Sequence, residues 1–405
     1  MGGPADFDPL DPRFAADPYA TYARLRAEPS PMWSERLGLF LVARADQIQA
    51  VTRHGAAVRS LEGLRPQAEL RERRRAENWH DMPFHERVVQ RSLLDSDGPD
   101  HRRLRKLVFG AFTGRGVERH RRFIETVVDE TLGTVSGEID FVADIAARIP
   151  GRVIARFLGA PDGDAERMAE WSRDTVAFFD VDRTPRKKRR AEGAVRLFWH
   201  HLDALARERA ARPRDDLLSA MVRDREAGLY ASRDEFISTC MLIVMAGHGS
   251  SIDAMGAGLS TLLDHPRAME RLRNEPALME TAVQEMIRFE SPLPFFHRHV
   301  EEEITVGGRV FPARTTFGLL YGAANRDERF FERADAFVPD RMPNRHLAFG
   351  HGAHLCLGNH LARLTLGIVF RRLLDRFAAI ERLGPTVWRR GLSVRGPESL
   401  PVRLG

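Results

Sequence analysis

The chain has 405 residues, of which 43% are apolar and 29% are charged, a globular composition large enough to enclose a cofactor. A chain with only two cysteines is not a disulfide scaffold. The net charge is +5, but the basic clusters have no accompanying aromatic residues for stacking on bases, so nucleic-acid binding is not predicted. No apolar run reaches the roughly 18–20 residues that span a bilayer, and residues 1–14 lack signal-peptide features, so we expect no membrane association and a cytoplasmic location.

Helical periodicity dominates the chain. Apolar residues three and four apart predict helices over residues 17–28, 100–112, 121–135, 216–229, 234–265 and 276–292. In the first of these, Asp17 is a suitable N-cap and Pro18 suits the first turn. The stretch 234–265 is the longest and most apolar, so it is expected to run through the centre of the protein, and the helix after it should stop before Pro292.

Strand-like segments are few. Residues 37–53 predict a short strand followed by a helix, and residues 303–320 predict a hairpin that turns at Gly307-Gly308. We therefore expect a mainly α protein with small antiparallel β sheets, in one domain over residues 1–405.

One of the two cysteines lies in an unusual stretch, HLAFGHGAHLCLGNHLARL, which begins at His346. Zinc bound by His351, His354, Cys356 and His360 is one interpretation, haem iron a second, and a buried structural thiol a third. The spacing fits no Cys-x-x-Cys pair and no usual pair of histidines. Repeated glycine lets a backbone pass close to a large flat partner and present N–H groups to a sulfur, which favours haem. Cys240 lies on an apolar helix and is predicted to be structural.

The run Phe349-Gly350-x-Gly352-x-His354-x-Cys356-x-Gly358 resembles the haem-binding loop of the cytochrome P450 family. The resemblance extends over almost the whole chain. It implies the cytochrome P450 fold, haem b as the cofactor, and Cys356 as the axial ligand of the haem iron.

Further family motifs occur in the expected order. Glu285-x-x-Arg288 resembles the family's Glu-x-x-Arg motif, with acid and base on one helical face, and Arg341 is the third member of the implied triad. An exposed helix ion pair is the alternative for a Glu-x-x-Arg taken alone. The resemblance also implies that the haem propionates are bound by cationic side chains, namely His101, Arg105, Arg298 and His354.

The long central helix departs from the family pattern. Most members carry Ala-Gly-x-Glu/Asp-Thr, whereas this chain has Gly249 in place of the acid and Ser250 in place of the threonine. Oxygen activation consumes two protons, so three interpretations stay open: water carries the protons, Asp253 or a substrate group supplies them, or the enzyme oxidises without inserting oxygen. Two glycines, Gly247 and Gly249, are also expected to loosen the helix.

The resemblance also places the substrate pocket, and its residues are apolar: Leu242, Met245, Ala246, Pro294 and Phe295. Each of these residues is equally common in an ordinary hydrophobic core, which is the alternative interpretation. Such a pocket suits a lipophilic or aromatic small molecule. Residues 176–193 correspond to a mobile lid in the family, and their basic run is interpreted as solvated surface or as a site that attracts a substrate carboxylate.

Electrons must come from other proteins, because no strand is followed by Gly-x-Gly-x-x-Gly. The expected partners are ferredoxin and ferredoxin reductase, docking on arginines that include Arg102 and Arg103, with O2 and a small molecule as substrates. The implied activity is that of a bacterial monooxygenase. The alternatives are oxidative coupling, cross-linking or desaturation without oxygen insertion, and a non-catalytic haem sensor.

Overall fold

The computed structural model describes residues 6–61 and 64–405, so the expectations for residues 1–5 lie outside the described residues. Contacts group the chain into two compact units. The first unit comprises the residues up to Val58 together with Val128–Ala147 and Ser250–Gly405, and the second comprises Arg59–Val127 and Arg148–Gly249. The single domain expected from the sequence stays a prediction.

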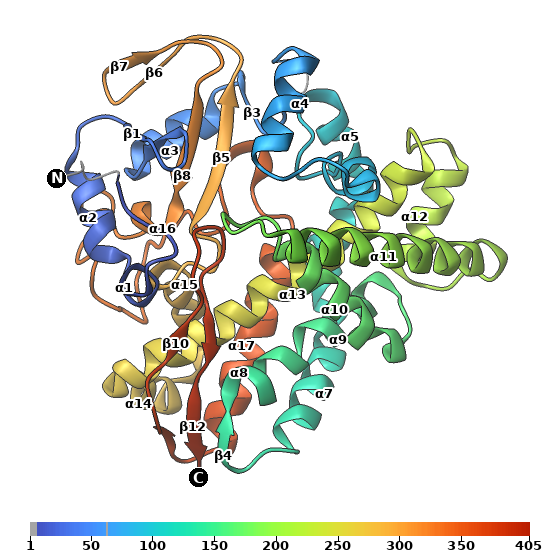
Figure 1. The fold of residues 1–405 in the computed structure, drawn as a ribbon. Helices are drawn as coiled ribbons and strands as arrows, with labels where there is room; N and C mark the ends of the chain where they lie inside the picture. Colours follow the sequence, from blue (N-terminus) through green and yellow to red (C-terminus); the bar gives the residue numbers. More distant parts are fainter. Residues whose placement is uncertain (1–5, 62–63) are drawn as a thin grey trace. The chain divides into compact units, whose positions relative to one another are not determined.

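The first unit contains a five-stranded sheet in the order β1-β2-β8-β5-β3 (Figure 1). Its strands are β1 (Met32–Ser34), β2 (Leu39–Val42), β3 (Ala57–Val58), β5 (Phe295–Val300) and β8 (Thr316–Leu320). Three of the four pairings are antiparallel, but β2 and β8 are parallel, with Leu41 opposite Gly318. The expectation of antiparallel sheets alone therefore misses one pairing, which joins strands far apart in the sequence.

Smaller sheets complete the β structure. The predicted hairpin is confirmed: β6 (Ile304–Val306) pairs with β7 (Arg309–Phe311), and Gly307 and Gly308 have φ of +58° and +75° at the turn. A three-stranded sheet has the order β4-β12-β9, and β10 pairs with β11. These strands are β4 (Gly137–Asp140), β9 (Ile380–Arg382), β10 (Val387–Trp388), β11 (Pro397–Ser399) and β12 (Pro401–Leu404).

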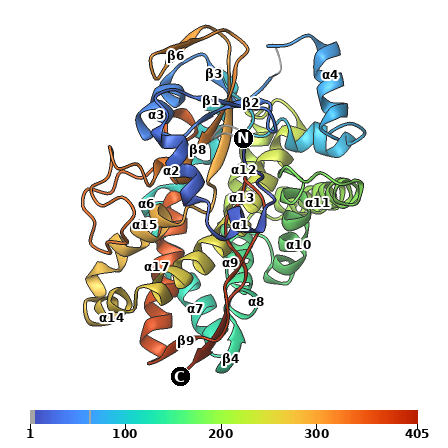
Figure 2. The same ribbon diagram turned by 60° about the vertical axis from the view of Figure 1, so that its left-hand side comes forward.

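Helices of the first unit pack near these sheets, with α14, α15 and α17 grouped together (Figure 2). They are α1 (Pro12–Ala16), α2 (Tyr19–Ala27), α3 (Ala45–Arg53), α8 (Phe141–Asp144), α14 (Pro266–Asn274), η5 (Pro276–Leu278), α15 (Met279–Phe289), α16 (Tyr321–Ala324), η6 (Gly352–His354) and α17 (Asn359–Arg376). α15 stops before Pro292 as predicted. The N-cap of α2 is Pro18, so the prediction of Asp17 is wrong by one residue, although its carboxylate still accepts the Tyr19 N–H at 2.9 Å.

The described residues of the second unit are helical or irregular. Its elements are α4 (Gln67–Ala76), the π-helix η1 (His85–Val89), α5 (Gly98–Phe109), η2 (Gly110–Phe112), α6 (Gly114–Glu118), α9 (Pro150–Leu158), η4 (Asp162–Asp164), α10 (Ala165–Val176), α11 (Pro185–Ala211) and α12 (Leu217–Glu226). α11 packs against α10 and α12. The elements α7 (Arg121–Leu132), η3 (Ala146–Arg148) and α13 (Arg233–Asp264) contribute residues to both units.

α13 is the long helix expected from the sequence. It runs without a break through Gly247 and Gly249, so the two glycines do not end the helix. By length and hydropathy it is the one helix of the described chain that could cross a membrane, contrary to the expectation that every apolar run is too short. Most of its most apolar 18-residue window is buried, which is typical of a core helix.

Candidate functional site

The cysteine loop is closed by its own backbone. The Cys356 N–H donates to the Phe349 carbonyl at 2.8 Å, and the Gly350 N–H donates to the Leu347 carbonyl at 2.8 Å. The Asn359 side chain, in the first turn of α17, donates to the Cys356 carbonyl at 2.8 Å. Cys356 is partly exposed and forms no disulfide. The thiol is therefore held at a fixed point just ahead of a helix.

Two glycines of the loop are required by the backbone. Gly350 and Gly352 have φ of +75° and +73°, in the left-handed region that glycine adopts without strain. A Cβ atom on residue 352 would lie 2.4 Å from the Thr52 carbonyl oxygen of α3. Gly358 has φ of −81° and open space where a Cβ would be, so neither its backbone nor its neighbours in the chain require glycine.

The histidines of the loop do not form a zinc site. His351 contacts Thr52 Oγ1 through Nδ1 at 3.1 Å and Arg53 through Nε2 at 3.3 Å. His360 Nδ1 contacts Arg363 at 3.0 Å. Within residues 6–61 and 64–405, no three His, Cys, Asp or Glu side chains are grouped as metal ligands. The zinc interpretation is therefore wrong, and a single thiol in a glycine-rich loop fits a haem thiolate.

The structure brings Glu285, Arg288 and Arg341 together in the interior. Glu285 and Arg288 are both fully buried, and their ion pair is bidentate at 2.7 and 2.8 Å. Arg341 Nε donates to both carboxylate oxygens of Glu285, at 3.1 and 3.0 Å. The remaining guanidinium N–H groups bind backbone carbonyls of residues 325–336. This network is not the exposed ion pair that was the alternative.

The same region anchors the start of the cysteine loop. The Asn325 side-chain oxygen accepts the Leu347 N–H at 2.6 Å, and His346 Nε2 contacts Gln284 of α15 at 2.8 Å. Burial lowers the pKa of His346 to about 3, with smaller contributions from Arg288 and Arg363. His346 is therefore neutral, and α15 holds the loop through a hydrogen bond as well as through the ion-pair network.

The altered part of α13 contains two different glycines. At Gly247 a Cβ would lie 2.8 Å from Ile154 Cδ1 of α9, so close helix packing accounts for this glycine. At Gly249 a Cβ would have no heavy atom within 4 Å among its neighbours. His248 between them is fully buried near Gly151, and burial lowers its pKa to about 4. Packing therefore does not explain why residue 249 lacks a side chain.

Asp253 lies one turn after Ser250 on α13. Its carboxylate is 1% exposed and lies 3.3 Å from Arg389, in the segment between β10 and β11. A Cβ on Gly396 of the same segment would lie 2.3 Å from Asp253 Oδ1. Burial raises the pKa of Asp253 to about 6, against the opposing effect of Arg389. Asp253 can therefore hold or release a proton near neutral pH.

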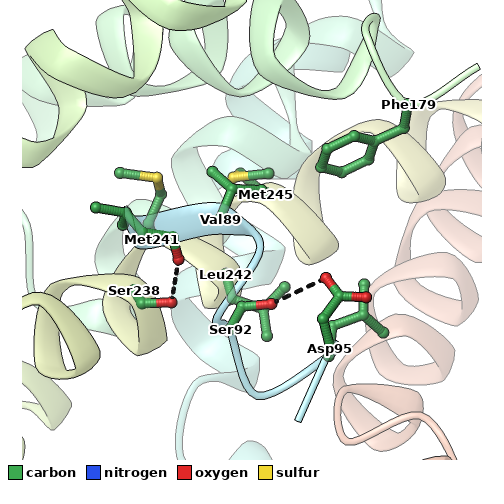
Figure 3. Close-up of a pocket in the computed structure, with 10 residues that line it drawn as sticks. Val89, Ser92, Asp95, Phe179, Ser238, Met241, Leu242 and Met245 are labelled. Atoms are coloured by element: carbon green, nitrogen blue, oxygen red, sulfur yellow. Dashed lines mark hydrogen bonds between the residues drawn. The ribbon is translucent and has the colours of Figure 1, made fainter. Parts of the chain in front are cut away.

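A cavity in the second unit lies beside the first half of α13 (Figure 3). Leu242 and Met245 line it as expected, whereas Ala246 does not. The other lining residues are Val88, Val89, Ser92, Leu94, Asp95, Phe179, Ser238 and Met241. Its volume is about 10 Å³, room for one water molecule, so side chains such as Phe179 must move to admit a larger ligand.

Two expected pocket residues lie in the first unit. Pro294 is buried against Gly322, where a Cβ would lie 2.9 Å from the proline Cβ. The Phe295 ring covers Gly318 of β8, where a Cβ would lie 2.6 Å from a ring carbon. Phe295 thus packs on the five-stranded sheet, and its role in substrate binding stays a prediction.

Comparisons with known proteins show which family this chain belongs to. The family model described as Cytochrome P450 matches residues 180–382. The chain is 33% identical over 411 residues to the polyketide biosynthesis cytochrome P450 PksS of Bacillus subtilis (strain 168), covering 98% of each chain.

The chain belongs to the cytochrome P450 family.

Other cytochromes P450 are similar to it as well. The 6-deoxyerythronolide B hydroxylase of Saccharopolyspora erythraea is 37% identical over 317 residues, covering 76% of this chain and 77% of the hydroxylase. A crystal structure of P450BioI in complex with acyl carrier protein ligated to hexadec-9Z-enoic acid has a TM-score of 0.89 at 29% identity, covering 97% of this chain and 100% of that one. Both the fold class and the enzyme class predicted from the sequence, a monooxygenase, are confirmed, so the non-catalytic sensor is not carried further.

Haem b is the cofactor of this cytochrome P450, and the residues present fit it. Cys356 offers a sulfur donor above a backbone that turns at two left-handed glycines. Arg298 of β5 is 5% exposed, and His354 ends η6 in the same unit. His101 is 3% exposed and lies one turn before Arg105 on α5. Binding of the propionates by these four side chains stays a prediction.

The two arginines predicted to receive the electron donor differ in the structure. Arg102 is exposed on α5. Arg103 binds Glu235 at 2.7 Å and Asp100 at 3.1 Å, and these acids raise its pKa. Arg102 is therefore the better candidate for a docking contact in this cytochrome P450, because its charge faces solvent.

Several residues of the site carry no signal that periodicity could reveal. Val89, Ser92 and Phe179 come from η1 and from irregular segments, where neither a helical nor a strand pattern applies. Ser238 donates to the Val88 carbonyl at 2.5 Å, and Ser92 donates to Asp95 at 3.5 Å. Asn359 was not predicted as a site residue, although the sequence contains a signal for it. An asparagine just after the cysteine motif is well placed to hydrogen-bond the backbone of the loop.

Proposed function

We propose that this cytochrome P450 hydroxylates a lipophilic or aromatic secondary metabolite in the cytoplasm, with O2 and with electrons from a ferredoxin and its reductase. The reaction takes one C–H bond, one O2, two electrons and two protons, and yields one alcohol and one water. Members of the family similar to this chain act in secondary metabolism. The relative from Saccharopolyspora erythraea is named a hydroxylase of 6-deoxyerythronolide B, which supports a substrate of similar size and polarity.

The observation that carries the proposal is the apolar lining beside α13, which must open to admit a substrate. Met241, Leu242 and Met245 give it flexible apolar walls, and Ser92 and Ser238 supply hydroxyl groups among them. A few polar groups in an apolar pocket orient a ligand while the walls bind it. Methionine side chains adapt to irregular ligand shapes, which suits the bulky products of secondary metabolism.

Bound haem b supplies the iron at which O2 is activated. The protein's own part begins with Cys356, whose sulfur would bind the haem iron and whose electron donation would be tuned by hydrogen bonds from nearby backbone N–H groups. Arg298, His354, His101 and Arg105 would hold the propionates. Glu285, Arg288 and Arg341 keep the cysteine loop in place.

Proton supply in this chain differs from that in most of the family. Ser250 provides a hydroxyl beside the reaction, while Gly249 provides no acid. Asp253 is the nearest carboxyl group along the same face of α13, and its pKa of about 6 lets it release a proton near pH 7. In this proposal Asp253 or water is the proton source, and the Ser250 hydroxyl relays each proton to the oxygen atom that leaves as water.

Product mass tests the proposal. The purified protein, supplied with a ferredoxin, its reductase and NADPH, is first screened for compounds that shift its haem absorption. Those compounds are then incubated with the full system, and the expected product is heavier than the substrate by one oxygen atom. Under 18O-labelled dioxygen, that atom must carry the label; an unlabelled oxygen overturns hydroxylation.

A second candidate is oxidation without oxygen insertion, and Gly249 is the observation that favours it. The resemblance associates altered central helices of this kind with some coupling and cross-linking members of the family. The product of desaturation or coupling is lighter by two hydrogen atoms. The same mass measurement therefore separates the two candidates.

A further inference from the structure

The first half of α11 is strongly basic. Between residues 183 and 196 the sequence RTPRKKRRAEGAVR has seven cationic side chains and one carboxylate, Glu192. The helix begins at Pro185, and the Thr184 side chain caps it by accepting the Lys187 N–H. None of these cationic side chains has a role in the proposed hydroxylation.

About half of these charges are used within the second unit. Lys187 binds Asp182 at 2.8 Å, and Arg190 and Asp174 form an ion pair at 2.6 Å. Lys188 donates to the Asn78 side chain at 3.3 Å. These three cations therefore have partners within the protein.

The other arginines point to solvent. Arg186, Arg189 and Arg196 are exposed, and none of them forms an ion pair with a residue in the described part of the chain. On a helix, Arg189 and Arg196 lie two turns apart on one face, about 10 Å along the axis at 1.5 Å per residue. Three like charges on one face raise the local positive potential and attract an acidic surface.

A hollow of about 300 Å³ lies on this face. Its lining consists of Asp81, Lys188, Arg189, Glu192, Gly193 and Arg196. Gly193 has open space where a Cβ would be, so no close contact explains a glycine inside a 27-residue helix. A glycine there costs about 1 kcal/mol relative to alanine. The sequence thus keeps a depression between Arg189 and Arg196 at the expense of helix stability.

An apolar side chain borders the same surface. Leu197 is 50% exposed and lies one turn after Gly193. Exposed leucine beside arginines and a depression is the composition of a protein-binding surface, in which an apolar contact is ringed by charge. We name the surface formed by Arg186, Arg189, Gly193, Arg196 and Leu197 the α11 basic face.

This face is connected to the substrate cavity through Glu192. The Glu192 carboxylate accepts the backbone N–H groups of Phe84 and His85 at 2.9 and 3.0 Å, where η1 begins. Val88 and Val89 of η1 line the cavity beside α13. A protein bound on the α11 basic face therefore rests on an element that forms the cavity wall.

We propose that the α11 basic face docks a small acidic carrier protein that brings the substrate as a covalently attached group. The partner presents a helix with carboxylates two turns apart, which meet Arg189 and Arg196, and an apolar side chain that contacts Leu197. The inference rests on the proposed function, because it assigns a delivery route to the substrate of that reaction. The docking surface is separate from Arg102 on α5.

Binding of an acyl carrier protein tests the inference without turnover. A bacterial acyl carrier protein, labelled with a fluorophore, is titrated with the haem-loaded enzyme and with the double variant Arg189→Glu/Arg196→Glu, and anisotropy gives Kd. The matched control is Arg115→Glu/Arg119→Glu, which makes the same charge change at two exposed arginines on and just after α6. We expect the first variant to raise Kd at least about tenfold and the control to change it less than about threefold.

A second measurement fixes the identity of the partner. The rate of haem reduction by ferredoxin should be unchanged in Arg189→Glu/Arg196→Glu and lower in Arg102→Glu. An equal Kd for wild type and the α11 variant overturns the inference, and so does a loss of ferredoxin reduction in the α11 variant. Neither result depends on the product formed, so failure here is distinguishable from failure of the proposed hydroxylation.

Discussion

The α carbon of Gly352 lies so close to Thr52 that a Cβ atom would approach the Thr52 carbonyl oxygen to 2.4 Å. The cysteine loop therefore packs directly on the C-terminal turn of α3, with His351 adding a contact to Thr52 Oγ1. This contact fixes the loop at Gly352, and Gln284 of α15 holds it at His346.

Gly352→Ala is expected to destabilise the protein, because alanine is strained at φ of +73° and has no room beside Thr52. We predict a loss of about 1–3 kcal/mol in the free energy of unfolding, measured by urea titration, together with a lower haem content. Gly367→Ala is the control, because that glycine lies inside α17 with open space around it. It should raise the stability by about 0.4–1 kcal/mol, and a loss at both positions would contradict the account.

Glu285→Gln removes the charge that two buried arginines share. Arg288 and Arg341 would each lose an ionic partner while remaining largely buried. We predict a loss of roughly 3–5 kcal/mol in the free energy of unfolding, and purified protein with little haem. Glu280→Gln, an exposed position on the same helix, is the control and should behave like wild type. Full haem content in Glu285→Gln would show that the network does not hold the loop.

Gly249→Glu restores an acid where most of the family has one. A Cβ atom has open space at this position, and replacing glycine should raise helix stability by up to about 1 kcal/mol. We predict a rise of about twofold or more in product formed per NADPH consumed, with less peroxide released. Gly249→Ala gains the same helix propensity without the carboxyl group and should leave that ratio unchanged. An unchanged ratio in both variants would rule out a shortage of protons.

Asp253 gives the stability of the protein a specific pH dependence. Its pKa is raised to about 6 from an ordinary value near 3.8, so between these values the folded state holds a proton that the unfolded state has released. The free energy of unfolding contributed by this group is therefore full below about pH 3.8 and is lost as the pH rises through about 6. Asp253→Asn does not titrate, so it should remove a fall on the order of 2–3 kcal/mol. Parallel curves for wild type and variant between pH 4 and 7 would be inconsistent with a buried, titrating Asp253.

Motifs with fixed spacing were the part of the site that the sequence could predict. The glycines around Cys356 and the i, i+3 pair Glu285 and Arg288 are local patterns, and the fold class followed from the family that shares them. Helix ends were also predictable where proline sets them, as before Pro292, and the turn at Gly307-Gly308 follows from backbone freedom alone.

Contacts between distant residues could not be predicted in this way. The parallel pairing of β2 with β8, the packing of Thr52 on Gly352 and the bond from Asn325 to Leu347 all join segments that no local pattern relates. The difference between Gly247 and Gly249 is of the same kind, because it depends on whether Ile154 of α9 lies opposite. Phe295 shows the limit for pocket residues, since an apolar side chain beside a proline fits a sheet core as well as a cavity wall.

The bond between the Cys356 sulfur and haem iron is the central claim, and the absorption spectrum of the reduced protein under carbon monoxide tests it most directly. A thiolate ligand shifts the main haem band to a long wavelength that a neutral nitrogen ligand does not produce. We predict that shifted band for the wild-type protein and its loss in Cys356→His, which can retain haem through nitrogen. A folded, haem-containing wild-type protein without the shifted band would contradict the account.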